Sequence, residues 1–158
     1  MKFRNFFRIL LCSVALFSLA ACSKEEAPSF IDDGNTCYVG DIVVPGYGSN
    51  FTDKDIKVEL TFNEADKTVD MLIKEVKFAE AMPLRLDMTV KGISYTVAGS
   101  KITIVGDNIV PEAMGGPFEM YKITDLSGEV TASDFSFSMK CGEFPVTFTG
   151  KAVLTSAK

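Results

Sequence analysis

The stretch Asp55–Phe62, D-I-K-V-E-L-T-F, decides the fold class. Its four even-numbered residues are apolar and its four odd-numbered residues are polar. A period of two places all the apolar side chains on one face of a β-strand, whereas an amphipathic helix repeats them every three or four residues. The stretch therefore predicts a strand with one buried face and one solvated face.

The same alternation recurs along the chain. It is clear in 84–91, 135–140 and 144–154, and weaker in 38–44, 68–78, 93–97, 101–105 and 120–130. Many short strands with one apolar face each, and no convincing helical periodicity after the first residues, predict an all-β fold. We expect a single antiparallel meander β-barrel of 8–10 strands, because closing the sheet removes its exposed edges.

Two breaks in the alternation predict irregular strand pairing. Within 68–78 the apolar residues switch from odd to even positions, which predicts a β-bulge near Lys74–Glu75. A similar switch across Gly92 predicts a glycine bulge or a tight turn there.

The N-terminus is typical of an export signal. Residues 1–8 contain Lys2, Arg4 and Arg8 without an acid, and residues 9–21 are uncharged and mostly apolar. This order predicts a signal peptide over residues 1–21. Its last residues and the next one, L-A-A-C at 19–22, resemble the lipobox of bacterial lipoproteins, with Cys22 as the lipidated residue. A plain secretory cleavage site is the alternative.

The residues after Cys22 bear on where the protein is displayed. The sequence S-K-E-E at 23–26 resembles the surface-export signal of Bacteroidetes-type lipoproteins, although a charged, solvated linker has the same composition. We expect a protein anchored to the cell envelope by the lipid on Cys22, in the outer membrane, with surface exposure left open. Residues 22–36 are predicted to be a tether, and residues 37–158 the barrel domain.

Composition excludes several classes of function. The chain has 158 residues, with 16 Lys and Arg against 21 Asp and Glu, and loss of the signal peptide shifts its net charge from -5 to -8. Without a basic cluster, an acidic domain is a poor ligand for nucleic acid. The chain has no His, which excludes catalytic His and His-ligated metals. We expect no cofactor and no metal.

The chain resembles the calycin-like β-barrel domains of Bacteroidetes lipoproteins. The resemblance lies in Y-V-G at 38–40, the strand Asp55–Phe62 and P-V-T-F-T-G at 145–150, behind a lipobox. It implies a meander barrel whose interior can hold a small apolar ligand. Lipocalins proper have Gly-x-Trp in the first strand; this chain has no Trp, and Tyr38 is the nearest substitute.

From this resemblance we expect a non-catalytic protein that binds a small apolar molecule. The predicted ligand-lining residues are Phe62, Met71, Met88, Phe137 and Phe148. Residues 107–118 are predicted to form a long loop that places Ile109, Val110 and Met114 over the barrel mouth as a lid. The alternative function is a structural or accessory surface module that contacts a protein or a glycan through its loops. A solvent-accessible cavity favours the first function, and a filled barrel with an exposed aromatic patch favours the second.

Three pairs of acidic residues have the chemistry for catalysis or metal binding. Asp32 with Asp33, Asp53 with Asp55, and Glu64 with Asp66 could serve as a glycosidase pair, but Asp is also frequent in turns. Calcium binding by the oxygen ligands near Asp53 lacks EF-hand spacing. We therefore expect no enzyme.

The two cysteines of the predicted barrel could form a disulfide in an oxidising compartment. In a meander with an even number of strands, however, Cys37 begins the first strand and Cys141 precedes the last one. The two residues then lie at opposite rims, too far apart for a bridge. We predict free thiols.

Overall fold

The computed structural model describes residues 28–31, 36–46 and 48–153. The predicted signal peptide (1–21), the lipobox with Cys22 and the export signal lie outside the described residues. Within the described residues, no helix has the length and apolar character needed to cross a bilayer.

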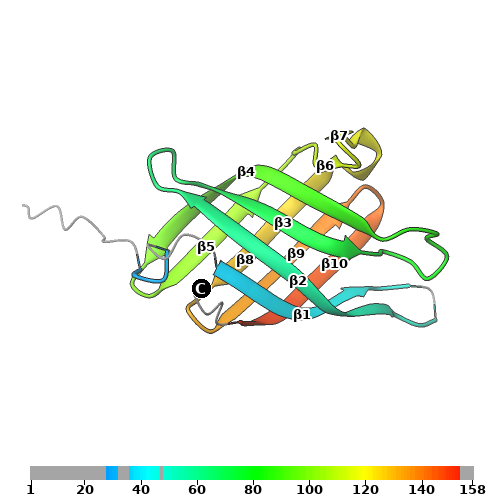
Figure 1. Ribbon diagram of the computed structural model, residues 1–158, viewed down its shortest axis with the longest axis horizontal. Coiled ribbons are helices and arrows are strands. Elements are labelled where there is room, and N and C mark those ends of the chain that lie inside the picture. The colour runs from blue at the N-terminus through cyan, green and yellow to red at the C-terminus, as the bar shows by residue number, and fades with distance from the viewer. Residues whose placement is uncertain (1–27, 32–35, 47, 154–158) are drawn as a thin grey trace, which may run out of the picture.

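Eight antiparallel strands form a closed meander barrel (Figure 1). Each strand of the barrel pairs with the barrel strands before and after it, and the first strand closes the ring by pairing with the last, in a register that places Tyr38 opposite Ala152. The predicted all-β meander barrel is thus confirmed. The strands are β1 (Thr36–Val44), β2 (Phe51–Asn63), β3 (Thr68–Val76), β4 (Leu86–Ala98), β5 (Lys101–Gly106), β8 (Ile123–Val130), β9 (Asp134–Cys141) and β10 (Phe144–Ala152).

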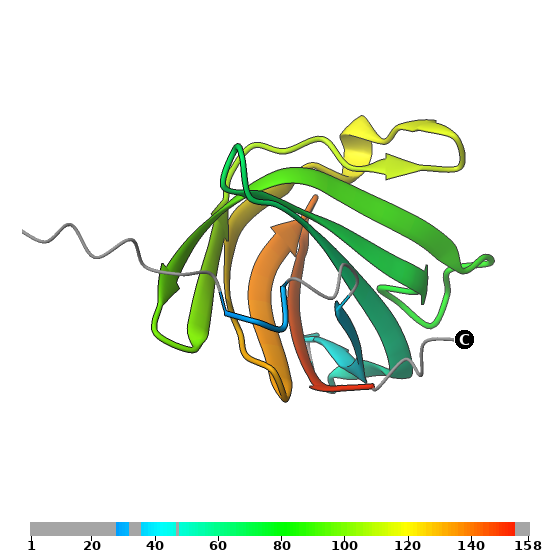
Figure 2. The same cartoon turned by 60° about the vertical axis from the view of Figure 1, so that its left-hand side comes forward.

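A short excursion separates β5 from β8. It contains β6 (Glu112–Ala113), β7 (Gly116–Pro117) and the 3-10 turn η1 (Glu119–Tyr121). β6 pairs with Met88 and Thr89 of β4, whereas β5 pairs with the other end of β4, from Ser94 onward. Figure 2 shows the small hairpin lying along β4. The excursion therefore extends the barrel wall where β5 has ended.

The barrel interior is one continuous apolar core. Inward-facing side chains of all eight strands are buried, among them Tyr38, Met71, Phe135 and Phe148, each at 0–1% exposure. Gly150 makes room for this packing, because a Cβ atom there would lie 2.5 Å from Cζ of the Phe148 ring.

Four β-bulges interrupt the ladders, at Lys54–Asp55, Lys74–Glu75, Lys91–Gly92 and Asp125–Leu126. The predictions for Lys74–Glu75 and Gly92 are confirmed. Each bulge contains a residue with positive φ, a conformation common in bulges.

All four bulges are capped in the same way. In each, the backbone N–H of the positive-φ residue donates to an Asp carboxylate on a neighbouring segment. The donor and acceptor pairs are Asp55 with Asp41, Glu75 with Asp87, Gly92 with Asp70, and Asp125 with Asp107. The acids thus satisfy donors that the interrupted ladders leave unpaired.

One end of the barrel is closed by the segment that precedes β1. Figure 2 shows residues 28–31 crossing this end of the barrel. Phe30 packs against the core, and Ile31 is buried at 5% exposure. Residues 28–31, which were predicted to belong to the tether, therefore cover the open end of the core with apolar side chains. Thr36, also assigned to the tether, is the first residue of β1. At the same end, the Tyr38 hydroxyl donates to the Thr131 carbonyl oxygen at 2.6 Å.

The other end is closed by aromatic rings. Phe78, from the β3–β4 connection, stacks on Phe144 with ring centroids 6.1 Å apart and lies 5.8 Å from Tyr121. Phe118 extends the cluster, with its centroid 4.8 Å from that of Tyr121. Both ends of the barrel are thus covered by side chains of the chain itself.

Candidate functional site

The five predicted ligand-lining residues point inward but lie at different levels of the core. Phe62 contacts Tyr95 edge-on, with ring centroids 5.3 Å apart. Phe137 and Phe148 stack at 5.2 Å. Met88 lies near the opposite end, where its sulfur is 3.9 Å from Sγ of Cys141.

The packing around these residues is tight. Met71 and Met88 are 0% exposed, Phe148 is 1% exposed, and Phe137 is 4% exposed. A side chain that lines a water-sized void keeps accessible surface facing that void, so values of 0–1% leave no such void beside the first three residues. Phe62 is half-buried at the margin of the core.

The predicted lid residues do not act together. Ile109 packs against the core and is half-buried, as is Val110, but Met114 is 76% exposed at the tip of the β6–β7 hairpin. The prediction that Met114 folds over the mouth is wrong, because pairing of β6 with β4 directs the hairpin along the barrel wall. Phe78, Tyr121 and Phe144 close that end instead.

Cys37 and Cys141 are free, as predicted, and both are buried. Burial raises the pKa of the Cys141 thiol to about 12 and also raises the pKa of the Cys37 thiol. Neither thiol is therefore a nucleophile at neutral pH, since only the thiolate attacks.

Two of the acidic pairs found in the sequence, Asp53 with Asp55 and Glu64 with Asp66, lie in the described part of the chain. Asp53 is buried in an ion pair, whereas Asp55 is exposed at a bulge. Asp66 accepts from Asn63 Nδ2 at 2.8 Å within the β2–β3 turn. Asp32 and Asp33 lie outside the described residues. In the part of the chain that is described, no three Cys, Asp or Glu side chains gather as a metal site.

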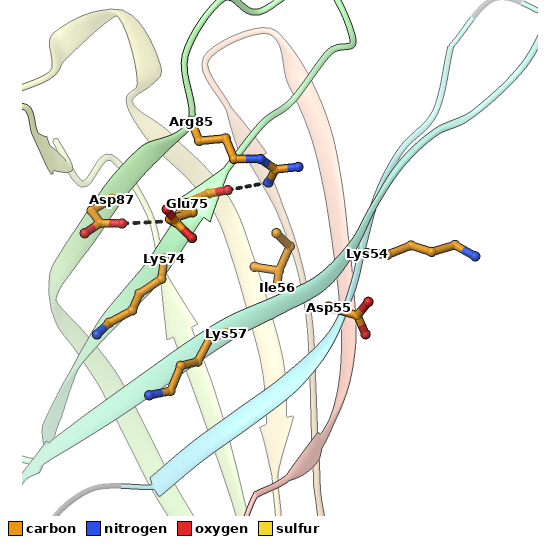
Figure 3. Close-up of a pocket in the computed structure, with 8 residues that line it drawn as sticks. All are labelled: Lys54, Asp55, Ile56, Lys57, Lys74, Glu75, Arg85 and Asp87. Atoms are coloured by element: carbon orange, nitrogen blue, oxygen red, sulfur yellow. Dashed lines mark hydrogen bonds between the residues drawn. The ribbon is translucent and has the colours of Figure 1, made fainter.

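The structure points to a different site, on the outer surface between β2 and β3. These strands pair only from Val58 to Asn63 and from Thr68 to Ile73, and beyond Val58 and Ile73 they separate. The opening holds a groove of about 460 Å³, which we call the seam groove (Figure 3). It is lined by Lys54, Asp55, Ile56, Lys57, Lys74, Glu75, Arg85 and Asp87.

An ion pair closes the far end of this opening. Arg85 donates to the Asp53 carboxylate from Nη1 and Nη2, at 2.9 and 2.8 Å, and Nη1 also donates to the Glu75 carbonyl oxygen at 2.6 Å. The Asp53 carboxylate accepts a further hydrogen bond from the Lys77 N–H at 2.9 Å. Asp53 is the buried charged residue of the described chain, at 4% exposure. Side chains thus join β2 and β3 where the backbone ladder is missing.

One side of the seam groove is basic. Nζ of Lys57 and Nζ of Lys74 lie 2.7 and 3.3 Å from the same oxygen of Glu59. The hydrogen bond to Glu59 raises the pKa of Lys57, and the hydrogen bond from Lys57 lowers the pKa of Glu59. Two ammonium groups therefore share one carboxylate.

The other side is acidic. Glu75 and Asp87 lie close to each other on β3 and β4, where an Asp87 oxygen accepts the Glu75 N–H at 2.9 Å (Figure 3). Ile56 of β2 lines the groove but is only 3% exposed, while Lys54 and Asp55 point away from the other lining residues (Figure 3). Arg85 is held by Asp53, so the carboxylates of Glu75 and Asp87 are the acidic groups that the groove offers to a ligand.

The seam groove was not predicted from the sequence. The predicted bulge at Lys74–Glu75 did locate two of its lining residues. The second bulge, at Lys54–Asp55, went unnoticed because the inward position before it is occupied by Asp53, a charged residue, and the switch in apolar positions is hidden.

Neither the protein-family models nor the curated proteins compared with the chain give a match. Among solved structures, the chain is similar to a proposed outer membrane protein of Bacteroides fragilis, with 23% sequence identity and a TM-score of 0.46. The similarity covers 73% of this chain and 49% of that chain, so this chain spans about half the length of that protein. Membership of the calycin-like domains stays a prediction from the sequence.

Proposed function

We propose that this protein is a lipid-anchored, non-catalytic module of the bacterial cell envelope that recognises a polar partner at the seam groove. The lipobox-like sequence ending at Cys22 supports the anchor. With two or more acyl chains the anchor alone holds a protein on the membrane, so the barrel is free to serve recognition.

The packing of the barrel carries the proposal. An eight-stranded barrel is just wide enough either to be filled by its own side chains or to hold one small ligand. The 0–1% exposure of Met71, Met88 and Phe148 supports the filled state. The exposed large apolar residues of the described chain are aliphatic or Met, so an aromatic docking patch is not part of the proposal.

The absence of catalysis is part of the same proposal. The groove acids Glu75 and Asp87 lie next to each other, and Asp53 is held by Arg85 and Lys77. A hydrolytic pair needs two carboxyl groups on opposite sides of a bond, one of which carries a proton. The buried thiols lack a base to activate them, since the chain has no His.

Carriage of a small apolar ligand is the second candidate, and one observation favours it. Tyr95, near the Phe62 end of the barrel, is 3% exposed, and its hydroxyl has no hydrogen-bond partner. An unpaired buried hydroxyl costs about 1–3 kcal/mol, and a bound molecule or water that supplies an acceptor would remove that cost.

Native mass spectrometry of the delipidated protein purified from its host separates the two candidates. We expect the mass of the polypeptide alone. A co-purifying apolar molecule that is lost when Tyr95→Phe is introduced would contradict our proposal and establish the second candidate.

The anchor is tested separately by metabolic labelling with an alkyne fatty acid. The wild-type chain is expected to incorporate the label and to sediment with membranes, whereas Cys22→Ala is expected to do neither. Labelling that survives in Cys22→Ala would place the modification elsewhere.

A further inference from the structure

The seam groove carries charges of opposite sign on its two sides, and this restricts what it can bind. Its volume of about 460 Å³ is large enough for a small ligand, because it falls within the usual range of ligand pockets. Its lining includes side chains from three strands, β2, β3 and β4, so its shape depends on the barrel and not on one loop.

The basic side has one positive charge in excess. Lys57 and Lys74 share the single carboxylate of Glu59, and their side chains are 41% and 38% exposed. Each ammonium has three N–H donors, so contact with one carboxylate oxygen leaves donors for a ligand. A carboxylate or another anionic group fits this side.

The acidic side has two negative charges in excess. Glu75 and Asp87 are exposed, and the nearby guanidinium of Arg85 is neutralised by Asp53. Only one oxygen of Asp87 is engaged, by the Glu75 N–H. An ammonium group fits this side.

We infer that the seam groove binds a short peptide with free termini, its carboxylate at Lys57 and Lys74 and its ammonium at Glu75 and Asp87. This inference rests on the proposed recognition function of the groove. Ile56 also lines the groove but is only 3% exposed, so the charged groups on the two sides carry the recognition.

The chemistry disfavours a ligand with one kind of charge. A simple anion would meet Glu75 and Asp87, and a simple cation would meet Lys57 and Lys74. Contact between like charges lowers the affinity, whereas a dipolar ligand makes favourable contacts at both sides.

Trialanine provides the probe, in four forms: free termini, N-acetylated, C-amidated and blocked at both ends. Binding is followed by ¹⁵N chemical shifts of the chain without its first 22 residues, which retains every described contact. We expect the free peptide to shift the groove residues and each single block to weaken binding roughly two- to fivefold, the size of a partly exposed ion pair.

Variants assign each terminus to its side. Lys57→Ala with Lys74→Ala is expected to make binding insensitive to C-amidation, and Glu75→Gln with Asp87→Asn to make it insensitive to N-acetylation. Asn at position 87 keeps an acceptor for the Glu75 N–H. Lys101→Ala, which breaks an exposed pair with Glu129 elsewhere on the barrel, is the matched control and should change nothing.

These experiments distinguish a failure of the peptide inference from a failure of the proposed recognition function. Groove shifts that are equal for all four peptides, or that need only one charged terminus, overturn the dipolar ligand and leave the groove as a recognition site. The absence of groove shifts with every form also overturns the peptide inference, while native mass spectrometry still decides between surface recognition and a ligand inside the barrel.

Discussion

The β9–β10 wall and the β2–β3 wall are built in opposite ways. β9 and β10 are paired along their whole length, from Cys141 opposite Phe144 to Asp134 opposite Lys151. β2 and β3 are paired over six positions, and then Asp53 and Arg85 join them through side chains. The inner side of the first wall holds Phe rings, and the second wall holds a buried charge. If the seam groove is the recognition site, as proposed here, then stability and recognition occupy separate sides of the barrel.

The largest expected effect lies in the fully paired wall. Phe148→Ala removes a ring that stacks on Phe137 and contacts Phe135, and should lower the free energy of unfolding by about 3–5 kcal/mol. Urea unfolding followed by circular dichroism measures it. Thr149→Ala, next to it on the exposed face, should change the value by less than about 0.5 kcal/mol. Similar losses for both variants would show that the wall is not the stabilising side.

The second-largest expected effect is a loss of folding stability at alkaline pH, through Cys141 in the same wall. The pKa of Cys141 is about 12 in the folded protein, above the ordinary value of 9.0. The unfolded thiol ionises first, so stability is fully present below about pH 9 and falls by about 1.4 kcal/mol per pH unit above it, until the folded thiol also ionises. Urea unfolding of the wild type and of Cys141→Ala between pH 8 and pH 10.5 measures this loss. A variant with the same pH slope as the wild type would refute it.

The side-chain junction of the other wall should contribute less. Asp53→Ala leaves the Lys77 N–H without its acceptor and releases Arg85, for a loss of about 1–2 kcal/mol. Hydrogen exchange should accelerate in the separated parts of β2 and β3, but not in β9 and β10. Asp53→Asn, which keeps an acceptor for Lys77, serves as the control. Uniform acceleration over the barrel would mean that the walls are not independent.

The bulge caps are expected to have the smallest effect. Asp70→Ala removes the acceptor of the Gly92 N–H, which is exposed and can bind water instead, so we expect a loss of about 0.5–1 kcal/mol. Asp87→Ala should cost a similar amount at Glu75 and, in addition, alter the seam groove. Equal effects of both variants on peptide binding would argue against the groove as the binding site.

Alternation of polar and apolar residues predicted most of the fold. The strands, the barrel, the free thiols and two of the four bulges follow from side-chain period and chain direction. The bulge at Asp125–Leu126 has a weaker signal in the sequence, in which the odd-numbered Ile123 is followed by only two even-numbered apolar residues, Leu126 and Val130. The packing role of Ile31 was missed because a short apolar segment among polar residues has no period.

The seam groove could not be derived in the same way. Asp53 and Arg85 are 32 residues apart, and nothing in the local sequence of either residue specifies its partner. Lys57 and Lys74 meet over Glu59 only because the register places β2 beside β3. Local pattern determines which face a residue occupies, whereas the register of the whole barrel determines its neighbours.

Closure of the barrel through its first and last strands has a consequence for how the chain folds. The pairing of Tyr38 with Ala152 joins residues at nearly opposite ends of the domain, and contacts of such long range make β-proteins fold on the scale of milliseconds to seconds. Until β10 has emerged, β1 and β9 each have one edge without a hydrogen-bonded neighbour. A chain exported from its N-terminus, as proposed here, can therefore complete its fold only after the last strand has crossed the membrane, and any delay at that step prolongs the time during which it can aggregate.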